Sequence, residues 1–492
     1  MSNKLKVMCI FSIFIFLIVC SYAQAFSVQG IVTGRIYEEL SISNNQIYQE
    51  FYDMQLGWIR IEFEEFYNAP QGSTFNSPEV QANKVKFQNV INNAKAKGLK
   101  VLGVIANSAI PEIQGFPDTD SSIQDFVYAV QWHLNNYNVD AIEIWNEPGC
   151  NVKFTNDNLH RYAKTLIEVY SQLKPLYPNV IFVGPATANA EKNVWIGNDS
   201  SYWEKSIFNC TLMINYRNNN NGKLPLDVIS WHAYGTGGPP DGNFYFGRTF
   251  AQYYSEIINY KDRTGRNIIG NYPIWFTEYG WDSYLVGEEN QRIYTEKMIK
   301  MIYNYAQIQV PFLYTYRDDG NSAGSEGNHR GIRTSADSGS IKKRVYWPFV
   351  SHNCLVGLFT NDGVNEWTID QIIDEYFERG GRIKFGLAWK HPSAPWYGDK
   401  AHYWGPNNNG CIQQFNYGEY GECAILMKWE IGRAYTLKGN FYTFYMNNSG
   451  PYNLLLGWIT SNEYYQDGYW WQNCENGKMR MDQSGNIIRV AY

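Results

Sequence analysis

The chain has 492 residues, of which 44% are hydrophobic and 18% charged, a globular composition that excludes a disordered or fibrous chain. Lys and Arg number 41 against 47 Asp and Glu, so the formal charge is −6, without the basic character of a nucleic-acid-binding protein. Aromatic residues make up 17% of the chain, which suits stacking on sugar rings but suits ordinary cores as well. The length favours one large domain with a smaller one.

The first 25 residues have the pattern of a secretory signal peptide. Lys4 and Lys6 precede the uncharged, mostly apolar run Val7–Cys20, and Ala23–Ala25 supplies small residues for cleavage. The run has 14 residues, which is short for a membrane span, and an uncleaved anchor is the alternative. We expect a secreted, extracellular protein that starts at Phe26 with a formal charge of −8 and has no membrane partner.

From residue 26 to about residue 350, short β-rich apolar runs alternate with helical patterns. The eight runs are 26–34, 57–63, 99–106, 141–145, 180–185, 226–233, 273–277 and 312–316. Alternation of this kind is typical of βαβ units on a parallel sheet. Eight units over this length predict an α/β fold, the (β/α)8 TIM barrel, whose active sites lie at the carboxyl ends of the strands.

Two of the intervening helices have clear sequence signals. Ser77 before Pro78 is typical of a helix start, and Gly98 is typical of a helix end. Apolar residues recur at helical spacing between Leu159 and Leu173, and Pro175 follows them. We expect both apolar stripes to pack against the barrel.

Two carboxylates follow predicted strands of this barrel. The fourth run leads into Trp145-Asn146-Glu147-Pro148, and the seventh leads into Thr277–Trp281, which contains Glu278. Further polar or aromatic candidates at strand ends are Arg60, Glu62, His232, Tyr234, Tyr316 and Arg317. Two carboxyl groups at one barrel mouth are what cleavage of a glycosidic bond needs, because one protonates the leaving oxygen and the other attacks or stabilises the anomeric carbon.

These motifs resemble clan A of the glycoside hydrolases, retaining enzymes on (β/α)8 barrels. The sequences of these motifs are most similar to family 39 and to family 5-like members, and the resemblance covers about residues 26–350. The resemblance implies that Glu147 is the acid/base and Glu278 the nucleophile. It also implies that Asn146 contacts the sugar 2-hydroxyl.

The resemblance extends to the residues around the two carboxylates. It assigns roles at the sugar site to Asn146, Arg60, His232 and Tyr234. Among them, Arg60 holds the nucleophile ionised and Tyr234 hydrogen-bonds it. We predict that Trp281, Tyr316 and Arg317, which follow strands seven and eight, bind substrate as well. Many clan members carry a Trp after strand eight, where Tyr316 and Arg317 stand here, so we expect polar or charged sugar substituents. Trp145 and Trp231 are expected in the core.

We therefore predict a secreted retaining β-glycosidase that hydrolyses O-glycosidic bonds of a polysaccharide or oligosaccharide by double displacement. An inverting enzyme is a minor variant. The alternative from another class is a catalytically inactive barrel that binds carbohydrate or cell wall, and the intact carboxylate pair favours the enzyme. Neither a cofactor nor a metal is predicted, because the chain has no CxxC or HExxH motif and its seven His are scattered. The sugar, the linkage and the oligomeric state stay open.

After residue 352 the sequence becomes rich in Gly, Asn, Tyr and Trp. A faint repeat relates residues 375–389 to residues 444–458, and each copy leads into a turn that contains Gln and Gly. We predict a β-rich two-repeat domain over residues 366–492, separate from the catalytic domain over residues 26–352. No long spacer joins the two, so we expect them to pack together.

This second domain is similar to LGFP-type repeats, which occur beside secreted wall-active enzymes. Leu456-Gly457-Trp458 and Trp471–Gly477 carry the similarity, with Ile459 in place of the usual Pro and Cys474 in place of the usual aromatic residue. The resemblance implies binding to a wall or polysaccharide, for which Trp396, Trp404, Trp470 and Trp471 offer ring faces. A purely supporting role for the barrel is the alternative.

Six cysteines follow the signal peptide, an even number that suggests disulfides in a secreted protein. The expected pairs are Cys411–Cys423, Cys150–Cys210 and Cys354–Cys474. Sequons at Asn198, Asn209 and Asn447 predict surface glycosylation if the host glycosylates.

Overall fold

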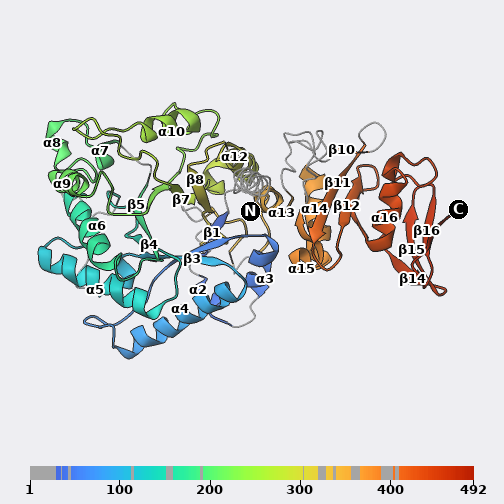
Figure 1. Cartoon of the computed structure of the whole chain (residues 1–492), viewed down its shortest axis with the longest axis horizontal. Helices are drawn as coiled ribbons and strands as arrows, with labels where there is room; N and C mark the ends of the chain where they lie inside the picture. Colours follow the sequence, from blue (N-terminus) through green and yellow to red (C-terminus); the bar gives the residue numbers. More distant parts are fainter. Residues whose placement is uncertain are drawn as a thin grey trace, which may run out of the picture.

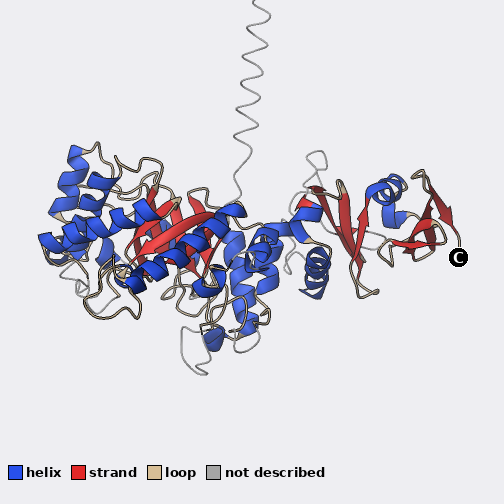
Figure 2. Ribbon diagram, turned by 90° about the horizontal axis from the view of Figure 1, so that it is seen from below, coloured by secondary structure: helices blue, strands red, loops and turns tan. Residues whose placement is uncertain are grey.

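The computed structural model describes most of the chain. The described residues are 29–34, 36–42, 46–111, 116–150, 159–188, 192–302, 304–319, 329–335, 340–355, 366–388, 403–404 and 409–492. The predicted signal peptide lies outside them. Figures 1 and 2 show a barrel followed, toward the C-terminus, by two units of helix and sheet in a row.

Eight parallel strands close into a barrel in chain order. They are β1 (Gly30–Val32), β2 (Trp58–Glu62), β3 (Lys100–Ile105), β4 (Ala141–Ile144), β5 (Ile181–Ala188), β6 (Val228–His232), β7 (Ile274–Tyr279) and β8 (Ile308–Leu313). Gly30 in β1 lies beside Trp58 of β2 and beside Phe312 of β8, which closes the sheet. The predicted (β/α)8 TIM barrel is confirmed.

Helices follow most of the strands and cover the barrel. They are α2 (Tyr37–Leu40), α3 (Gln46–Asp53), α4 (Pro78–Ala96), α5 (Asp120–Asn136), α6 (Leu159–Leu173), α7 (Lys192–Trp195), α8 (Ser200–Trp203), α9 (Thr211–Asn219), α10 (Phe250–Ile258), α11 (Ser283–Val286), α12 (Glu288–Ile302) and α13 (Tyr346–Leu355). Pro78 begins α4 as predicted, and Gly98 follows it with a φ of +74°. Within the described part of the chain, no helix has the length and apolar character that a membrane span needs.

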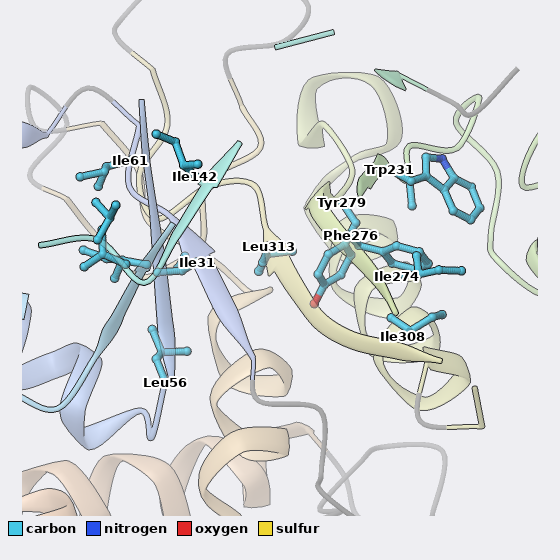
Figure 3. Close-up of a cluster of buried hydrophobic side chains, with 14 of the residues drawn as sticks. Ile31, Leu56, Ile61, Ile142, Trp231, Ile274, Phe276, Tyr279, Ile308 and Leu313 are labelled. Atoms are coloured by element: carbon cyan, nitrogen blue, oxygen red, sulfur yellow. The ribbon is translucent and has the colours of Figure 1, made fainter. Parts of the chain in front are cut away.

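Side chains of the barrel strands alternate between two apolar layers. Trp58, with residues such as Leu102 and Trp275, fills the inside of the barrel. Ile59 and Ile61 point outward into a larger core under the helices, part of which Figure 3 shows. This period of two places Arg60, between the two isoleucines, inside the barrel above Trp58.

Two predicted core tryptophans lie in the outer layer. Trp145 contacts Phe116 edge-on at 4.9 Å between ring centroids, and Trp231 contacts Phe276 at 4.9 Å. Each is 1% exposed, so neither ring face is available to a sugar. The prediction that both are core residues is confirmed.

The C-terminal region consists of two similar units. The first contains α14 (Glu366–Glu378), α15 (Gly381–Phe385), β9 (Gly386–Ala388), β10 (Tyr403–Trp404), β11 (Gly410–Tyr417), β12 (Cys423–Lys428) and β13 (Tyr435–Lys438). The second contains α16 (Gly439–Asn447), the 3-10 turn η7 (Gly450–Tyr452), β14 (Tyr464–Gln466), β15 (Tyr469–Cys474), β16 (Gly477–Met481) and β17 (Ile487–Val490). Each has an antiparallel meander of four strands after its helix, with β9 added beside β11 in the first.

The registers of the two sheets correspond. Ala388 pairs with Phe415 at one edge of the first sheet, and Ile459 bridges to Cys474 at the same place in the second. The sequence repeat places Phe415 and Cys474 at equivalent positions in the two copies. The two units are therefore structural copies at this edge, while the LGFP-type resemblance itself stays a prediction.

The first unit shares the outer core of the barrel. The Tyr376 hydroxyl of α14 donates to the Asp53 carbonyl oxygen of α3 at 3.0 Å, and the Arg382 N–H donates to the Asp53 carboxylate at 3.0 Å. Tyr376 and Phe415 stack with centroids 5.5 Å apart inside that core. A second core, which includes Phe441 and Trp458, joins the second unit to the far face of the first sheet. The expected packing of this region on the barrel is present.

The predicted disulfides are not formed. Cys210, Cys411, Cys423 and Cys474 are buried free thiols, and the Cys354 side chain lies outside the described part. The hairpin expected between Cys411 and Cys423 is present, but Cys411 lies opposite Met427 and Cys423 opposite Phe415. Four residues of offset separate the two cysteines by roughly 14 Å along the strand, too far for a disulfide.

One predicted glycosylation site is also wrong. Asn209 is 2% exposed; its amide donates to the Ile196 carbonyl oxygen at 2.9 Å and accepts from the Arg263 N–H at 2.7 Å. An amide held in this way cannot carry a glycan on the folded protein. Asn198 and Asn447 are exposed, so these sequons stay predictions.

Candidate active site

Glu147 is presented by a sharp turn at the end of β4. Trp145 and Glu147 both have left-handed backbone conformations, with φ of +70° and +48°, which non-glycine residues rarely adopt. The Glu147 N–H donates to the Ala186 carbonyl oxygen of β5 at 3.0 Å. Burial of the Trp145 ring and this hydrogen bond hold the turn, so the Glu147 side chain, 30% exposed, reaches the barrel mouth.

Glu278, near the end of β7, lies opposite Glu147 across the end of β6. It pairs with His232 in the sheet register. His232 Nδ1 lies 2.9 Å from Glu147 Oε1 and 3.5 Å from Glu278 Oε2. One ligand atom from each of the three side chains lies within 4.8 Å of the others. One oxygen of Glu147 therefore lies within 4.8 Å of one oxygen of Glu278. This fits the close carboxyl pair of retaining glycosidases, about 5–5.5 Å apart, better than the 6.5–9.5 Å of inverting enzymes.

One hydroxyl group and one guanidinium group fix the Glu278 carboxylate. The Tyr234 hydroxyl donates to Oε2 at 2.6 Å, and Arg60 Nη1 lies 2.7 Å from Oε1. Arg60 also donates through Nε to Glu143 at 2.8 Å and through Nη2 to Asn146 at 2.8 Å. Each of its three nitrogens therefore orients a different side chain of the site.

Charge and burial shift the titration of this cluster. Burial opposes the positive charge of Arg60, but the carboxylates of Glu143 and Glu278 outweigh it and raise the Arg60 pKa. Burial alone would raise the pKa of Glu147, but its hydrogen bond to His232 and the positive charge of that ring hold it below its ordinary value. Burial alone would lower the pKa of His232, but Glu278 and Glu147 raise it. A proton shared between Glu147 and His232 therefore rests mainly on the ring.

The part of the sequence that forms the barrel and this site matches a known family. Residues 19–314, more than half of the chain, match the family model described as Cellulase (glycosyl hydrolase family 5). The chain belongs to glycosyl hydrolase family 5. This confirms the predicted resemblance to the family 5 and family 39 group of clan A, and with the close carboxylate pair it makes the protein a retaining glycoside hydrolase.

The chain is also similar, at low identity, to several solved structures. A family 39 glycoside hydrolase from the gut symbiont Bacteroides cellulosilyticus WH2 is 14% identical, with a TM-score of 0.45 over 95% of this chain and 80% of that chain. A monomeric beta-xylosidase from Caulobacter crescentus CB15 is 15% identical, with a TM-score of 0.45 over 68% and 69% of the two chains. A Rhizomucor miehei beta-1,3-glucanosyltransferase is 14% identical, with a TM-score of 0.39 over 63% and 94%. A search of curated proteins found no match.

The structure of the family 5 enzyme brings six of the predicted site residues together and separates three others. Arg60, Asn146, Glu147, His232, Tyr234 and Glu278 form the cluster described above. Trp281 lies away from it: its ring is 3% exposed, its Nε1 donates to the Gly238 carbonyl oxygen at 3.1 Å, and it packs on Phe244. Its predicted substrate-binding role is wrong.

Tyr316 and Arg317 also lie outside the site. The Tyr316 hydroxyl donates to Glu50 of α3 at 2.7 Å, and Arg317 pairs with Glu39 at 2.5 Å. The cause is the position of β8, which ends at Leu313 and not at Tyr316 as predicted. Their predicted substrate-binding roles are therefore wrong.

Tyr314 is the residue that β8 delivers to the mouth, and the sequence prediction placed it at this strand end without giving it a role. Its ring meets that of Tyr234 edge-on at 6.4 Å, and its hydroxyl donates to Asp319 Oδ2 at 3.2 Å. Burial and then the negative charge of Glu278 raise its pKa. A strand assignment that started at Ile308 would have identified it as the first residue beyond β8.

Glu147, His232 and Glu278 are also the one group of three or more His, Cys, Asp and Glu side chains within ligand distance in the described part of the chain. Arg60 and Tyr234 already donate to both oxygens of Glu278. A cation at this place would have to displace these donors, so the donor set fits acid–base chemistry better than metal binding.

Proposed function

We propose that this family 5 enzyme is a secreted β-glycosidase that cleaves polysaccharides or oligosaccharides, with Glu278 as nucleophile and Glu147 as acid/base. The observation that supports it is the pair of carboxyl groups within 4.8 Å at one barrel mouth, one of them held by two donors. The alternative, an inactive carbohydrate-binding barrel, does not need this arrangement. Retention requires it, because the nucleophile must reach the anomeric carbon while the acid reaches the leaving oxygen.

The two steps follow from these positions. In the first, a Glu278 oxygen attacks the anomeric carbon, the bond to the leaving oxygen breaks, and that oxygen takes a proton from Glu147, to which His232 has passed it. In the second, Glu147 removes a proton from water, which attacks the same carbon and releases Glu278 as a carboxylate. His232, hydrogen-bonded to Glu147, holds a proton next to the acid between turnovers.

A hydrolysis screen tests the proposal. We expect turnover of at least one β-linked substrate among β-glucans, xylans, mannans and aryl β-glycosides, with a product whose anomeric configuration by early proton NMR is β. Glu278→Gln should remove turnover of every substrate with folding unchanged. Glu147→Gln should slow aryl glycosides with poor leaving groups far more than those with good ones, because only poor leaving groups need the proton. Equal losses on both would exclude the acid role.

Secretion is part of the proposal and is supported by Lys4, Lys6 and the apolar run Val7–Cys20. Protein recovered from the culture medium of a secreting host should begin at Phe26. Recovery of the uncleaved chain in membranes would identify an anchor.

We further propose that the second C-terminal unit binds polysaccharide. Register pairs place Tyr464, Trp471 and Arg480 side by side on one face of its sheet, and Tyr469 lies two residues before Trp471 on the same face. These rings are half-buried, and the Arg480 guanidinium lies 4.3 Å from the Tyr469 centroid. Flat aromatic rows of this kind suit stacking on sugar rings.

Co-sedimentation with insoluble polysaccharides tests this second role. Trp471→Ala should reduce the bound fraction and leave hydrolysis of small aryl glycosides unchanged. Trp470→Ala is the matched control, because Trp470 projects from the opposite face of the same strand and is 41% exposed. Equal effects of the two substitutions, or none, would exclude the proposed face.

A further inference from the structure

The chain beyond β8 returns to the barrel mouth. Residues 329–335 run beside residues 315–318: the Thr315 N–H donates to the Arg330 carbonyl oxygen at 3.3 Å, and the Ile332 N–H donates to the Thr315 carbonyl oxygen at 3.0 Å. The Asp318 N–H donates to the Arg333 carbonyl oxygen at 2.9 Å. These backbone bonds attach Arg330 to the strand end that carries Tyr314.

A buried ion pair holds the returning segment from the other side. Lys343 Nζ lies 3.0 Å and 3.2 Å from the two oxygens of Asp318, and it donates to the His329 carbonyl oxygen at 2.9 Å. The Gly331 N–H donates to Asp318 at 2.7 Å. Lys343 and Asp318 are 3% and 9% exposed. The residues before and after Arg330 are therefore both fixed.

The side chain of Arg330 lies over the active site. Its guanidinium carbon is 4.8 Å from the centroid of the Tyr234 ring, whose hydroxyl donates to Glu278. Its positive charge also acts on Glu147 and on Tyr314. Arg330 is half-buried, and no described residue hydrogen-bonds or ion-pairs with its guanidinium.

No other described charged residue discussed at the mouth provides a positively charged donor that is still available to a ligand. Arg60 is engaged with three acceptors inside the barrel, whereas Glu62 and Asp319, which act on Tyr314, are acidic. The family match ends at residue 314, so Arg330 stands on a segment that the family pattern does not include. The guanidinium of Arg330 has five N–H donors, no described acceptor, and a position beside the reacting groups. Its planar shape matches that of a carboxylate, which can accept two parallel hydrogen bonds from it.

We propose that Arg330 binds a carboxylate on the sugar unit at the cleaved bond, so that the enzyme acts on glycans that contain uronic acids. This inference rests on the proposed function and names its substrate class. Arg330 would act as a specificity residue: it contacts the C6 carboxylate, while Glu147 and Glu278 carry out the bond changes. A neutral sugar leaves the guanidinium to water and gains nothing from it.

Paired aryl glycosides test the inference. 4-Nitrophenyl β-glucoside and β-glucuronide differ only at C6, and the galacto and manno pairs extend the comparison to other configurations. We expect the wild-type enzyme to have the higher kcat/KM on one of the uronides. Arg330→Gln should reduce that value by about 10- to 100-fold, as loss of a charge-assisted hydrogen bond does, and change the neutral partner by less than about threefold. Arg330→Lys should retain part of the preference.

Arg433→Gln is the control for net charge, because Arg433 lies in the C-terminal region and its side chain is 58% exposed. It should leave both members of each pair unchanged. A wild-type enzyme that prefers the neutral partners, or an Arg330→Gln variant that slows both equally, would overturn the inference.

A binding measurement separates this inference from the proposed function. Calorimetry on Glu278→Gln compares cellobiouronic acid with cellobiose, which needs no turnover. Tighter binding of the acid that Arg330→Gln removes would support the carboxylate site even if no substrate were hydrolysed. Equal binding of the two would overturn it, while hydrolysis of neutral glycosides would leave the proposed function intact.

Discussion

At the residue scale, Arg60 holds the site together. It is 2% exposed and contacts Glu143, which is fully buried, as well as Glu278. Arg60→Met should lower the free energy of unfolding by about 3–5 kcal/mol, because it leaves two buried carboxylates without their cation. Urea unfolding measures this.

Arg60→Lys is the matched variant. It keeps the charge, but a single ammonium cannot reach Glu143, Glu278 and Asn146 with the geometry of the planar fork. We expect a smaller loss of stability than with methionine and a large loss of kcat. Full activity of Arg60→Lys would mean that only the charge of Arg60 matters.

The His232–Glu147 pair predicts a pH dependence of stability. The pKa of His232 is raised above its ordinary value of 6.5. The stabilisation of the folded protein by protonated His232 is therefore full below pH 6.5 and is lost as the pH rises through the raised pKa. The pKa of Glu147 is lowered, so its contribution is present above its ordinary value of 4.5 and is lost as the pH falls through the lowered pKa. The pair stabilises the protein most between these limits.

We therefore expect the stability difference between wild type and His232→Gln to shrink as the pH rises above 6.5. Urea unfolding at several pH values from 5 to 9 measures it. The wild type should lose stability relative to the variant as His232 deprotonates. A difference that stays constant over this range would show that His232 has the same pKa in the folded and the unfolded protein.

Several residues of this site could be predicted from sequence because strand ends converge in a barrel. Asn146 and Glu147 after β4, and Glu278 near the end of β7, needed only the correct strands. His232 and Arg60 followed from the same rule. Tyr234 did as well, although it lies two residues beyond β6.

At the element scale, β8 shows where the prediction failed. It runs from Ile308 to Leu313 and contains Gln309 and Pro311, which interrupt the apolar pattern that would have identified it. The predicted strand, 312–316, was therefore about four residues late. This shift placed Tyr316 and Arg317 at the mouth in error and left Tyr314 without a predicted role.

The return of residues 329–335 to the mouth could not be read from sequence at all. It depends on Asp318 and Lys343, which are 25 residues apart and belong to no regular element. Lys343→Met should destabilise the protein by about 3–5 kcal/mol, because Asp318 becomes a buried carboxylate without its partner. It should also displace the segment that carries Arg330 and lower activity.

Lys342→Met is the matched control for this prediction. Lys342 is the preceding residue, its side chain is 27% exposed, and its nitrogen lies 3.3 Å from Asp374. Its loss should cost less than about 1 kcal/mol. Similar effects of the two substitutions in urea unfolding would contradict the role of the buried pair.

At the scale of the whole molecule, the C-terminal region is not a detachable accessory. Its first unit shares the outer core of the barrel through Tyr376 and Phe385, and its helices contact α3. Deletion after about residue 365 should expose this core and give an insoluble or unstable barrel, measured by soluble yield and melting temperature. A soluble truncated protein that hydrolyses small aryl glycosides normally would contradict this.

The second unit is attached in a different way. Its core, with Phe441 and Trp458, meets only the far face of the first sheet, so deletion after Lys438 removes no contact of the barrel core. Loss of the second unit should destabilise the sheet of the first unit more than it destabilises the barrel. The weak sequence repeat predicted two copies, but it could not show that only one of them would share the barrel core, because that depends on packing between distant elements.

The assignment of Glu278 as nucleophile is the central claim, and trapping of its glycosyl ester tests it most directly. A panel of 2,4-dinitrophenyl 2-deoxy-2-fluoro-β-glycosides, neutral and uronic, should inactivate the enzyme. The fluorine slows both formation and hydrolysis of the glycosyl ester, while the good leaving group speeds only its formation, so the ester accumulates. Mass spectrometry of the digested protein should find one added sugar on the peptide that contains Glu278, and Glu278→Gln should take up none. A sugar attached to Glu147 or to another residue, or hydrolysis of substrates by Glu278→Gln at the wild-type rate, would contradict the account.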